Sequence, residues 1–139
     1  MPTIKSAEDL KDELSALAER IALESYSVKL DFSTESVKDV ERILSAFHNE
    51  YNRTKDESGL QGIALEFAAY IVKVIESNFQ RGFWSRDHRT FGPDTFPYAW
   101  QNTEIFPFGW CLKRIIDGPQ DDVWSKFQAL VLNKANGAA

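Results

Sequence analysis

The segment from Phe79 to Trp110 restricts the fold of this chain more than any other. Ten aromatic residues fall within these thirty-two positions, more than half of the chain's Phe, Trp and Tyr. Glycines and prolines interrupt them throughout: Gly82, Gly92, Pro93, Pro97, Pro107 and Gly109. Because aromatic residues favour strands while glycine and proline favour turns, we predict short strands with tight connections here, not a helix.

We expect these strands to form a three-stranded antiparallel meander over about residues 82–106. The pattern places the strands at 82–86, 96–100 and 104–106, with a long turn between the first two and a tight turn at 101–103. Asn102 can supply the positive φ that such a tight turn needs. A sheet this small is not stable alone, so one of its faces must pack on helices.

Hydrophobic periodicity predicts about five helices around the meander. After a first helix, we expect helices over residues 34–51, 60–79 and 108–117 and a fifth that starts after Asp121 or Asp122. The 60–79 segment is the most apolar and is predicted to be the central helix. The predicted fold is therefore a single α+β domain over residues 1–139, with the meander packed on the central helix and a frayed tail at 134–139.

Residues 1–26 are predicted to form a peripheral amphipathic helix. Ser6 and Asp9 have the spacing of an N-terminal cap. A narrow apolar stripe follows, made of Leu10, Leu14, Leu17 and Ile21. A stripe of this kind docks either on a core or on a second subunit, so we expect a monomer or a homodimer formed through this helix.

Composition and charge favour a compact soluble protein. A length of 139 residues suits one domain, and the 43% hydrophobic and 27% charged content is ordinary for globular proteins. The net charge of −5 argues against nucleic acid and anionic membranes as partners. Neither a signal-peptide pattern nor an apolar run of about 18 residues is present, so we expect a cytoplasmic location and no membrane association.

The sequence gives little support for catalytic or metal chemistry. Cys111 is the single cysteine and only two histidines are present, so we predict no disulfide, no metal site and no cofactor. No recognisable catalytic motif occurs, and we assign no catalytic residue. Cys111 lies in an apolar helical pattern, where a buried small side chain is expected in preference to a nucleophile.

The aromatic meander holds the candidate binding residues. Exposed Trp84, Tyr98 and Trp100, with Arg86 beside them, would make large contacts at low entropic cost. Alternatively, these rings fill the second half of the core, and we favour this interpretation for most of them. The same rings and arginines could form a platform for single-stranded nucleic acid, which the acidity of the chain disfavours.

Glu66 and His88 are two further candidates, each with two interpretations. On its nearly apolar helix, Glu66 is either a buried acid or base with a raised pKa, or part of a solvated polar edge with Tyr70, Lys73 and Glu76. His88 is either a base in a polar loop or, as we favour, a solvent-exposed loop histidine.

Two stretches resemble a group of small bacterial proteins of uncharacterised function. One is Leu30-Asp31-Phe32-Ser33 with Glu35, Ser36 and Val37 behind it, and the other is Phe106-Pro107-Phe108 followed by Lys113-Arg114 and Asp117-Gly118-Pro119. The resemblance covers about residues 30–127. Its motifs lie where secondary-structure elements are predicted to begin and end, so the resemblance implies a similar architecture and no catalytic residue.

These patterns favour binding over turnover. Our leading hypothesis is a non-catalytic protein-binding module of a bacterial cytoplasmic protein, with an inhibitor or immunity-type protein as one concrete form. The alternative is a small enzyme or small-molecule binder that uses Glu66, His88 or Glu104 in a pocket between the central helix and the meander.

Overall fold

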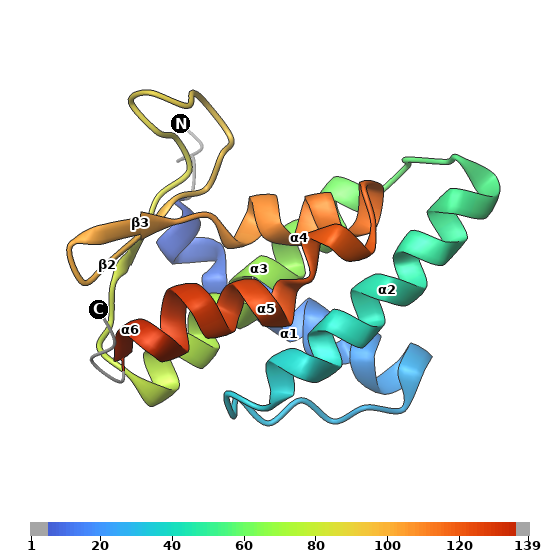
Figure 1. Cartoon of the computed structure of the whole chain (residues 1–139), viewed down its shortest axis with the longest axis horizontal. Coiled ribbons are helices and arrows are strands. Elements are labelled where there is room, and N and C mark those ends of the chain that lie inside the picture. Colours follow the sequence, from blue (N-terminus) through green and yellow to red (C-terminus); the bar gives the residue numbers. More distant parts are fainter. Residues whose placement is uncertain (1–5, 136–139) are drawn as a thin grey trace.

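Residues 6–135 are described by a computed structural model, which has five helices and a three-stranded antiparallel sheet (Figure 1). The longer helices are α1 (Ala7–Tyr26), α2 (Ser36–Thr54), α3 (Leu60–Asn78) and α4 (Pro107–Ile116). The strands are β1 (Phe83–Trp84), β2 (Tyr98–Trp100) and β3 (Thr103–Ile105). A 3₁₀ turn (Pro119–Asp121) leads into a continuous last helical segment: α5 (Val123–Phe127), a π-helical turn (Gln128–Leu132) and α6 (Asn133–Ala135). The predicted α+β architecture is confirmed.

The central position predicted for α3 follows from its composition. Nearly every residue from Ala64 to Ile75 is buried, and both α1 and α4 pack against this helix. The inward face of the sheet joins the same core through Trp84, Tyr98, Trp100 and Ile105. The indole N–H of Trp100 donates to the Gln80 carbonyl, 2.8 Å away and just beyond the end of α3. The meander is thus fixed at the C-terminal end of the central helix.

The sheet has the predicted order β1-β2-β3, with strands shorter than expected. Tyr98 pairs with Trp84 on one side and Ile105 on the other, which places their side chains on the buried face. The β2–β3 turn consists of Gln101 and Asn102, both with positive φ, as the two-residue turn of a twisted hairpin requires. Gly82 precedes β1, where a Cβ would lie 2.2 Å from the Ala99 carbonyl oxygen. The chain therefore needs glycine at this close approach.

The helix ends follow the local signals in the sequence. Ser6 and Asp9 form a reciprocal capping box at α1. Asp122 caps α5 by accepting from the Ser125 N–H. Pro107 occupies the first turn of α4, and Gly118 follows the helix with φ of 110°. Of the predicted frayed tail, residues 134 and 135 are helical, and 136–139 lie outside the described part of the chain.

The face of α1 that meets the core is not the predicted leucine stripe. The buried residues are Ala7, Lys11, Ser15, Ala18 and Ala22. Leu14 and Ile21 are only partly buried at the edge of this contact, and Leu17 is exposed. The physical reason is that small side chains allow close approach to α3, while Lys11 finds a carboxylate partner on that helix.

Lys113 and Arg114 are adjacent on α4 but lie in different surroundings, and Lys113 is exposed. Arg114 is buried, and its Nε lies 2.9 Å from both carboxylate oxygens of Glu41 on α2. Glu41 also accepts from the backbone N–H of Val123. One carboxylate thereby ties α2, α4 and α5 together.

Candidate functional site

The loop between β1 and β2 is organised around His88. The Nδ1 atom of His88 accepts from the backbone N–H groups of Thr90 and Phe91, at 2.9 and 3.1 Å. Because an accepting Nδ1 carries no proton, the ring proton is on Nε2, which donates to Glu104 Oε1 at 3.0 Å. His88 is only 8% exposed. The prediction of a solvent-exposed histidine is wrong, because the loop folds its own backbone around the ring.

Further bonds give this loop a defined shape. His88 and Gly92 exchange two backbone hydrogen bonds of 2.9 Å. The Arg86 guanidinium, a predicted binding group, is exposed and paired with Asp94, and the backbone N–H of Asp94 donates to Asp87. Figure 1 shows the loop standing out from the helical body. The loop therefore presents its tip in a preformed conformation.

Phe91 at this tip is the most exposed large apolar side chain in the described residues, at 65%. It lies edge-on to Phe106, with ring centroids 5.6 Å apart. Both rings line a cavity of about 500 Å³ with Phe108, Trp110 and Leu130. Leu130, in the π-helical turn, is 44% exposed. The cavity is thus an apolar, largely aromatic cleft between the loop, the start of α4 and the last helical segment.

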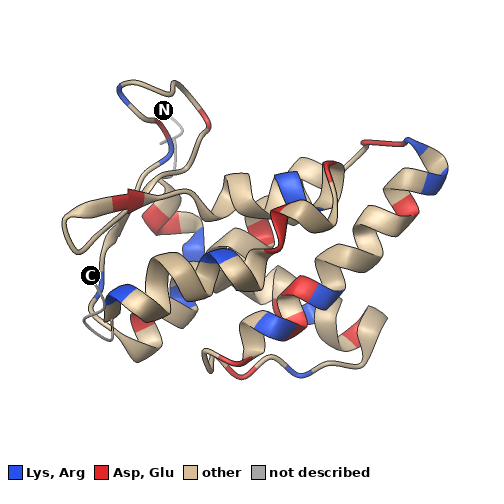
Figure 2. Cartoon of the chain, viewed as in Figure 1, with Lys and Arg blue, Asp and Glu red and all other residues tan. Residues whose placement is uncertain are grey.

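A second cavity of about 540 Å³ shares three of these residues: Phe106, Trp110 and Leu130. It continues along β3 on one side and past Asn133 and Lys134 on the other. We refer to the two cavities together as the aromatic groove. Lysines 113, 126 and 134 lie along it, and Figure 2 shows basic residues on α4 and on the last helical segment.

The predicted aromatic candidates lie elsewhere. Trp84, Tyr98 and Trp100 are all buried, so a role as exposed binding rings does not fit the structure, and the interpretation that they fill the core is confirmed. Burial raises the pKa of Tyr98 to about 12, and its hydroxyl accepts from the Gly82 N–H at 2.7 Å. Phe91 was not among the predicted binding residues. Its position next to Gly92 and Pro93, in a stretch typical of a surface turn, could have indicated an exposed ring.

Glu66 is half-buried, and burial raises the pKa of its carboxyl. The polar edge predicted beside it is not a solvated edge. Tyr70 is buried and its hydroxyl accepts from the Phe32 N–H, while Lys73 and Glu76 pair with residues of α1. Neither Glu66 nor His88 lines any of the five main cavities of the part of the chain that the structure describes.

One cavity of about 510 Å³ does lie between the start of α3 and the β1–β2 loop. Gln61, Gly62 and Leu65 line it from α3, and Arg86 and Phe96 line it from the loop. Of the predicted candidates, Arg86 alone contributes to it. Of the three groups that the enzyme alternative would need, His88 and Glu104 do meet, but none of the three lines this cavity.

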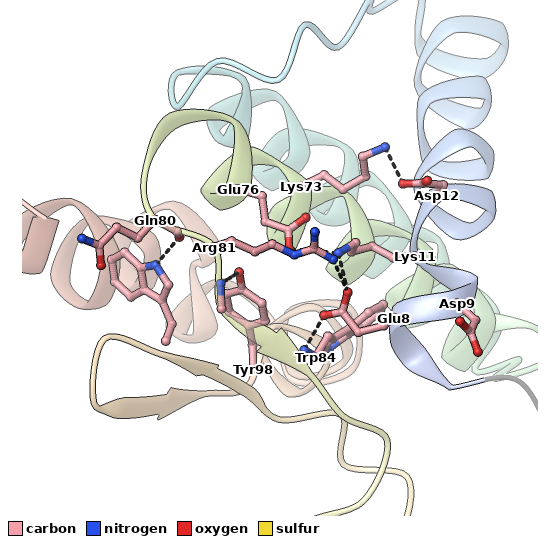
Figure 3. A network of polar contacts seen from close by, with 12 residues as sticks. Glu8, Asp9, Lys11, Asp12, Lys73, Glu76, Gln80, Arg81, Trp84 and Tyr98 are labelled. Carbon is pink, nitrogen blue, oxygen red and sulfur yellow. Dashed lines mark hydrogen bonds and ion pairs between the residues drawn. The ribbon is translucent and has the colours of Figure 1, made fainter.

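A polar network joins α1 to the end of α3 and to β1 (Figure 3). The buried ammonium of Lys11 lies 2.8 Å from Glu8 and 2.9 Å from Glu76. Glu8 also accepts from Arg81 and from the backbone N–H of Trp84, at 3.0 and 2.7 Å. Burial by itself would raise the pKa of Glu8, but these hydrogen bonds outweigh it and lower the pKa below its ordinary value. We refer to this network of Glu8, Lys11, Glu76, Arg81 and the Trp84 N–H as the clamp, because it holds α1 against α3 and β1.

Within residues 6–135, no group of three or more His, Cys, Asp or Glu side chains is arranged to hold a metal ion. Cys111 is buried, and burial raises the pKa of its thiol, which disfavours the reactive thiolate. None of the described helices is both long and apolar enough to span a bilayer. The chain matches no family model, no curated protein and no solved structure.

Proposed function

We propose that this chain is a non-catalytic protein-binding module whose binding surface is the aromatic groove. The observation that carries the proposal is the exposure of Phe91 on a preformed loop, next to a cleft lined by Phe106, Phe108 and Trp110. Rigid aromatic side chains beside a pocket are typical of energetic centres in protein interfaces. Because the loop is already held by its own hydrogen bonds, little ordering entropy opposes binding.

The open shape of the groove favours a macromolecular partner. Sites for small molecules bury most of the ligand surface, whereas two groove residues, Phe91 and Leu130, are left largely in solvent. A protein segment could cover both side chains at once. We therefore do not advance the small-molecule alternative, since the cavity beside α3 holds neither Glu66 nor His88.

As a concrete form, we propose an inhibitor or immunity-type protein of a bacterial cytoplasm. Its small size suits a protein that acts by covering part of a partner's surface. This form predicts that a toxic protein encoded beside its gene is the partner. Failure of the chain to bind or protect against such a neighbour would exclude the inhibitor or immunity-type role. It would not contradict the more general proposal of a protein-binding module.

The test is affinity capture from the source organism with matched variants. Leu130→Glu and Phe91→Ala alter exposed groove positions, while Leu23→Glu alters a 57% exposed position on α1. We expect one stoichiometric partner to be retained by the wild type and Leu23→Glu and lost from both groove variants. A partner that survives both groove substitutions would contradict the proposal. Trp84 and Trp100 are unsuitable targets because both are buried.

We further propose a monomer or a homodimer through the outward face of α1. Deleting α1 would expose the core, because Ala18 and Ala22 of this helix are fully buried against the rest of the chain. The variant Leu17→Glu changes an exposed residue of the predicted apolar stripe, to which Leu23 does not belong. Light scattering should give a monomer for this variant. A wild-type dimer that persists in it would exclude α1 as the interface.

A further inference from the structure

We infer that the occupant of the aromatic groove is an acidic amphipathic helix of the partner protein. This inference rests on the proposed function and adds the chemistry of the bound segment. Three properties of the groove carry it: the sign of its uncompensated charge, its length along the last helical segment, and the π-helical turn at its centre.

The first property is charge. Lys113 and Lys134 line the groove, and neither forms an ion pair within residues 6–135. Of the acidic side chains along the groove, Asp94 is paired with Arg86, while Glu104 accepts a hydrogen bond from the neutral His88 and keeps its charge, so two ammonium groups that are unpaired within the described residues stand against one such carboxylate. The groove of an acidic chain therefore presents free positive charge. Carboxylates on a partner would complement it and disfavour basic competitors.

The second property is length. Lys126 and Lys134 bound the groove along the last helical segment, eight positions apart. At about 1.5 Å per helical residue they are roughly 12 Å apart along the axis. Slightly more than two turns of a bound helix cover that span, with apolar residues at three- and four-residue spacing toward the groove and carboxylates on the flanks toward Lys113 and Lys134, because Lys126 is already paired with Asp121. β3 has only three residues, so pairing a partner strand along it would add few backbone bonds.

The third property is the π-helical turn from Gln128 to Leu132. Within it, Val131 is buried in the core while Leu130 faces solvent. Isolated π-helical turns are frequent at functional sites. In this groove the turn places an aliphatic side chain opposite Phe106 and Trp110, where it would contact the apolar face of the bound helix.

The test is selection from a library of randomised 16-residue peptides displayed on phage, with the purified chain as bait. We expect enriched sequences to carry aliphatic or aromatic residues at helical spacing, flanked by Asp or Glu. Fluorescence anisotropy of an enriched peptide should show at least tenfold weaker binding to Leu130→Glu and to the double variant Lys113→Glu, Lys134→Glu. Leu23→Glu should bind as the wild type does, and a Lys-for-Glu peptide should prefer the charge-reversed variant.

The outcomes separate this inference from the proposed function. Enriched peptides without acidic residues, lost on Leu130→Glu but not on charge reversal, would overturn the acidic helix and leave the binding module standing. The acidic helix is also overturned, and the binding module stands, if no peptide is enriched while affinity capture yields a partner whose binding is abolished by Leu130→Glu. Binding to phosphatidylglycerol vesicles that Leu130→Glu abolishes, without peptide or partner binding, would overturn both.

Discussion

Two helices cover the central helix α3 with contrasting chemistry. α1 meets α3 through alanines, a serine and the buried ammonium of Lys11, which two carboxylates hold. α4 meets the core mainly through Trp110, Cys111 and Ile115, all buried. Attachment of α1 to α3 therefore includes buried ionised groups, whereas the buried ion pair of α4, Arg114 with Glu41, joins it to α2, and its other buried contacts are mainly apolar.

This difference places the two exposed surfaces on supports of different kinds. The aromatic groove is built on α4 and the last helical segment, which are held by apolar packing and by the contacts of Glu41 with Arg114 and Val123. The exposed leucines of α1 are carried by the helix that the clamp holds. The buried apolar side chains of α4 do not titrate, which suits a surface that must keep a preformed shape for binding.

The largest expected effect is on the α4 side. Ile115→Ala removes a fully buried side chain and should lower the free energy of unfolding by about 2–5 kcal/mol. Urea denaturation should show one cooperative transition whose destabilisation is the same at low and high salt. A destabilisation well below about 2 kcal/mol would contradict the apolar attachment of α4.

On the α1 side, Lys11→Ala removes the buried ammonium between Glu8 and Glu76 and leaves both carboxylates paired with the exposed guanidinium of Arg81. We expect a loss of about 2–3 kcal/mol, below the value for a wholly buried pair, because the two carboxylate side chains remain 14% and 16% exposed. Hydrogen exchange should show lost protection in α1 before α4. Lys11→Met with Glu76→Gln is the matched control, which should recover stability. Equal loss of protection in both helices would show that Lys11 does not stabilise α1 more than α4.

Gly82→Ala tests the point where the clamp meets the sheet. The new Cβ would lie 2.2 Å from the Ala99 carbonyl oxygen and 2.8 Å from the Tyr98 ring. Relieving this overlap should cost about 1–3 kcal/mol. Gly62→Ala is the control, because no heavy atom lies within 4 Å of its added Cβ and alanine favours the helix. Thermal unfolding should show opposite shifts, and unchanged stability in Gly82→Ala would refute the close contact.

Local signals in the sequence were enough to predict the elements. Caps at Ser6 and Asp122, Pro107 in a first turn and Gly118 after a helix all act within a few residues. The alternation of aromatic and turn-forming residues likewise gave the meander and the positive φ of Asn102. The resemblance to a bacterial group stays a prediction.

Side-chain environments could not be predicted in the same way, because they depend on partners distant in sequence. Lys11 is buried because Glu76, sixty-five positions later, supplies a charge. Arg114 is buried because Glu41 lies on another helix. The groove likewise combines Phe91, Phe106 and Leu130 from three separate elements. No periodicity within one segment reveals such convergence.

The smallest expected effect is the pH dependence of the clamp. The hydrogen bonds of Glu8 lower its pKa in the folded protein below the unfolded value of about 4.3. A lowered pKa stabilises the fold above the unfolded pKa, and this contribution is lost as pH falls through the folded pKa. Urea denaturation from pH 7 to pH 3 should therefore show Glu8→Gln less stable than the wild type near neutrality, with the two converging in acid.

Glu66→Gln is the matched control with the opposite sign. Burial raises the pKa of Glu66, so its contribution is fully present below the unfolded pKa and is lost as pH rises through the folded pKa. Its neutral isostere should consequently be more stable than the wild type near pH 7 and similar to it in acid. If Glu8→Gln is also more stable than the wild type near pH 7, then burial outweighs the hydrogen bonds in setting the pKa of Glu8. The network of Lys11, Glu8 and Glu76 would then not stabilise the attachment of α1.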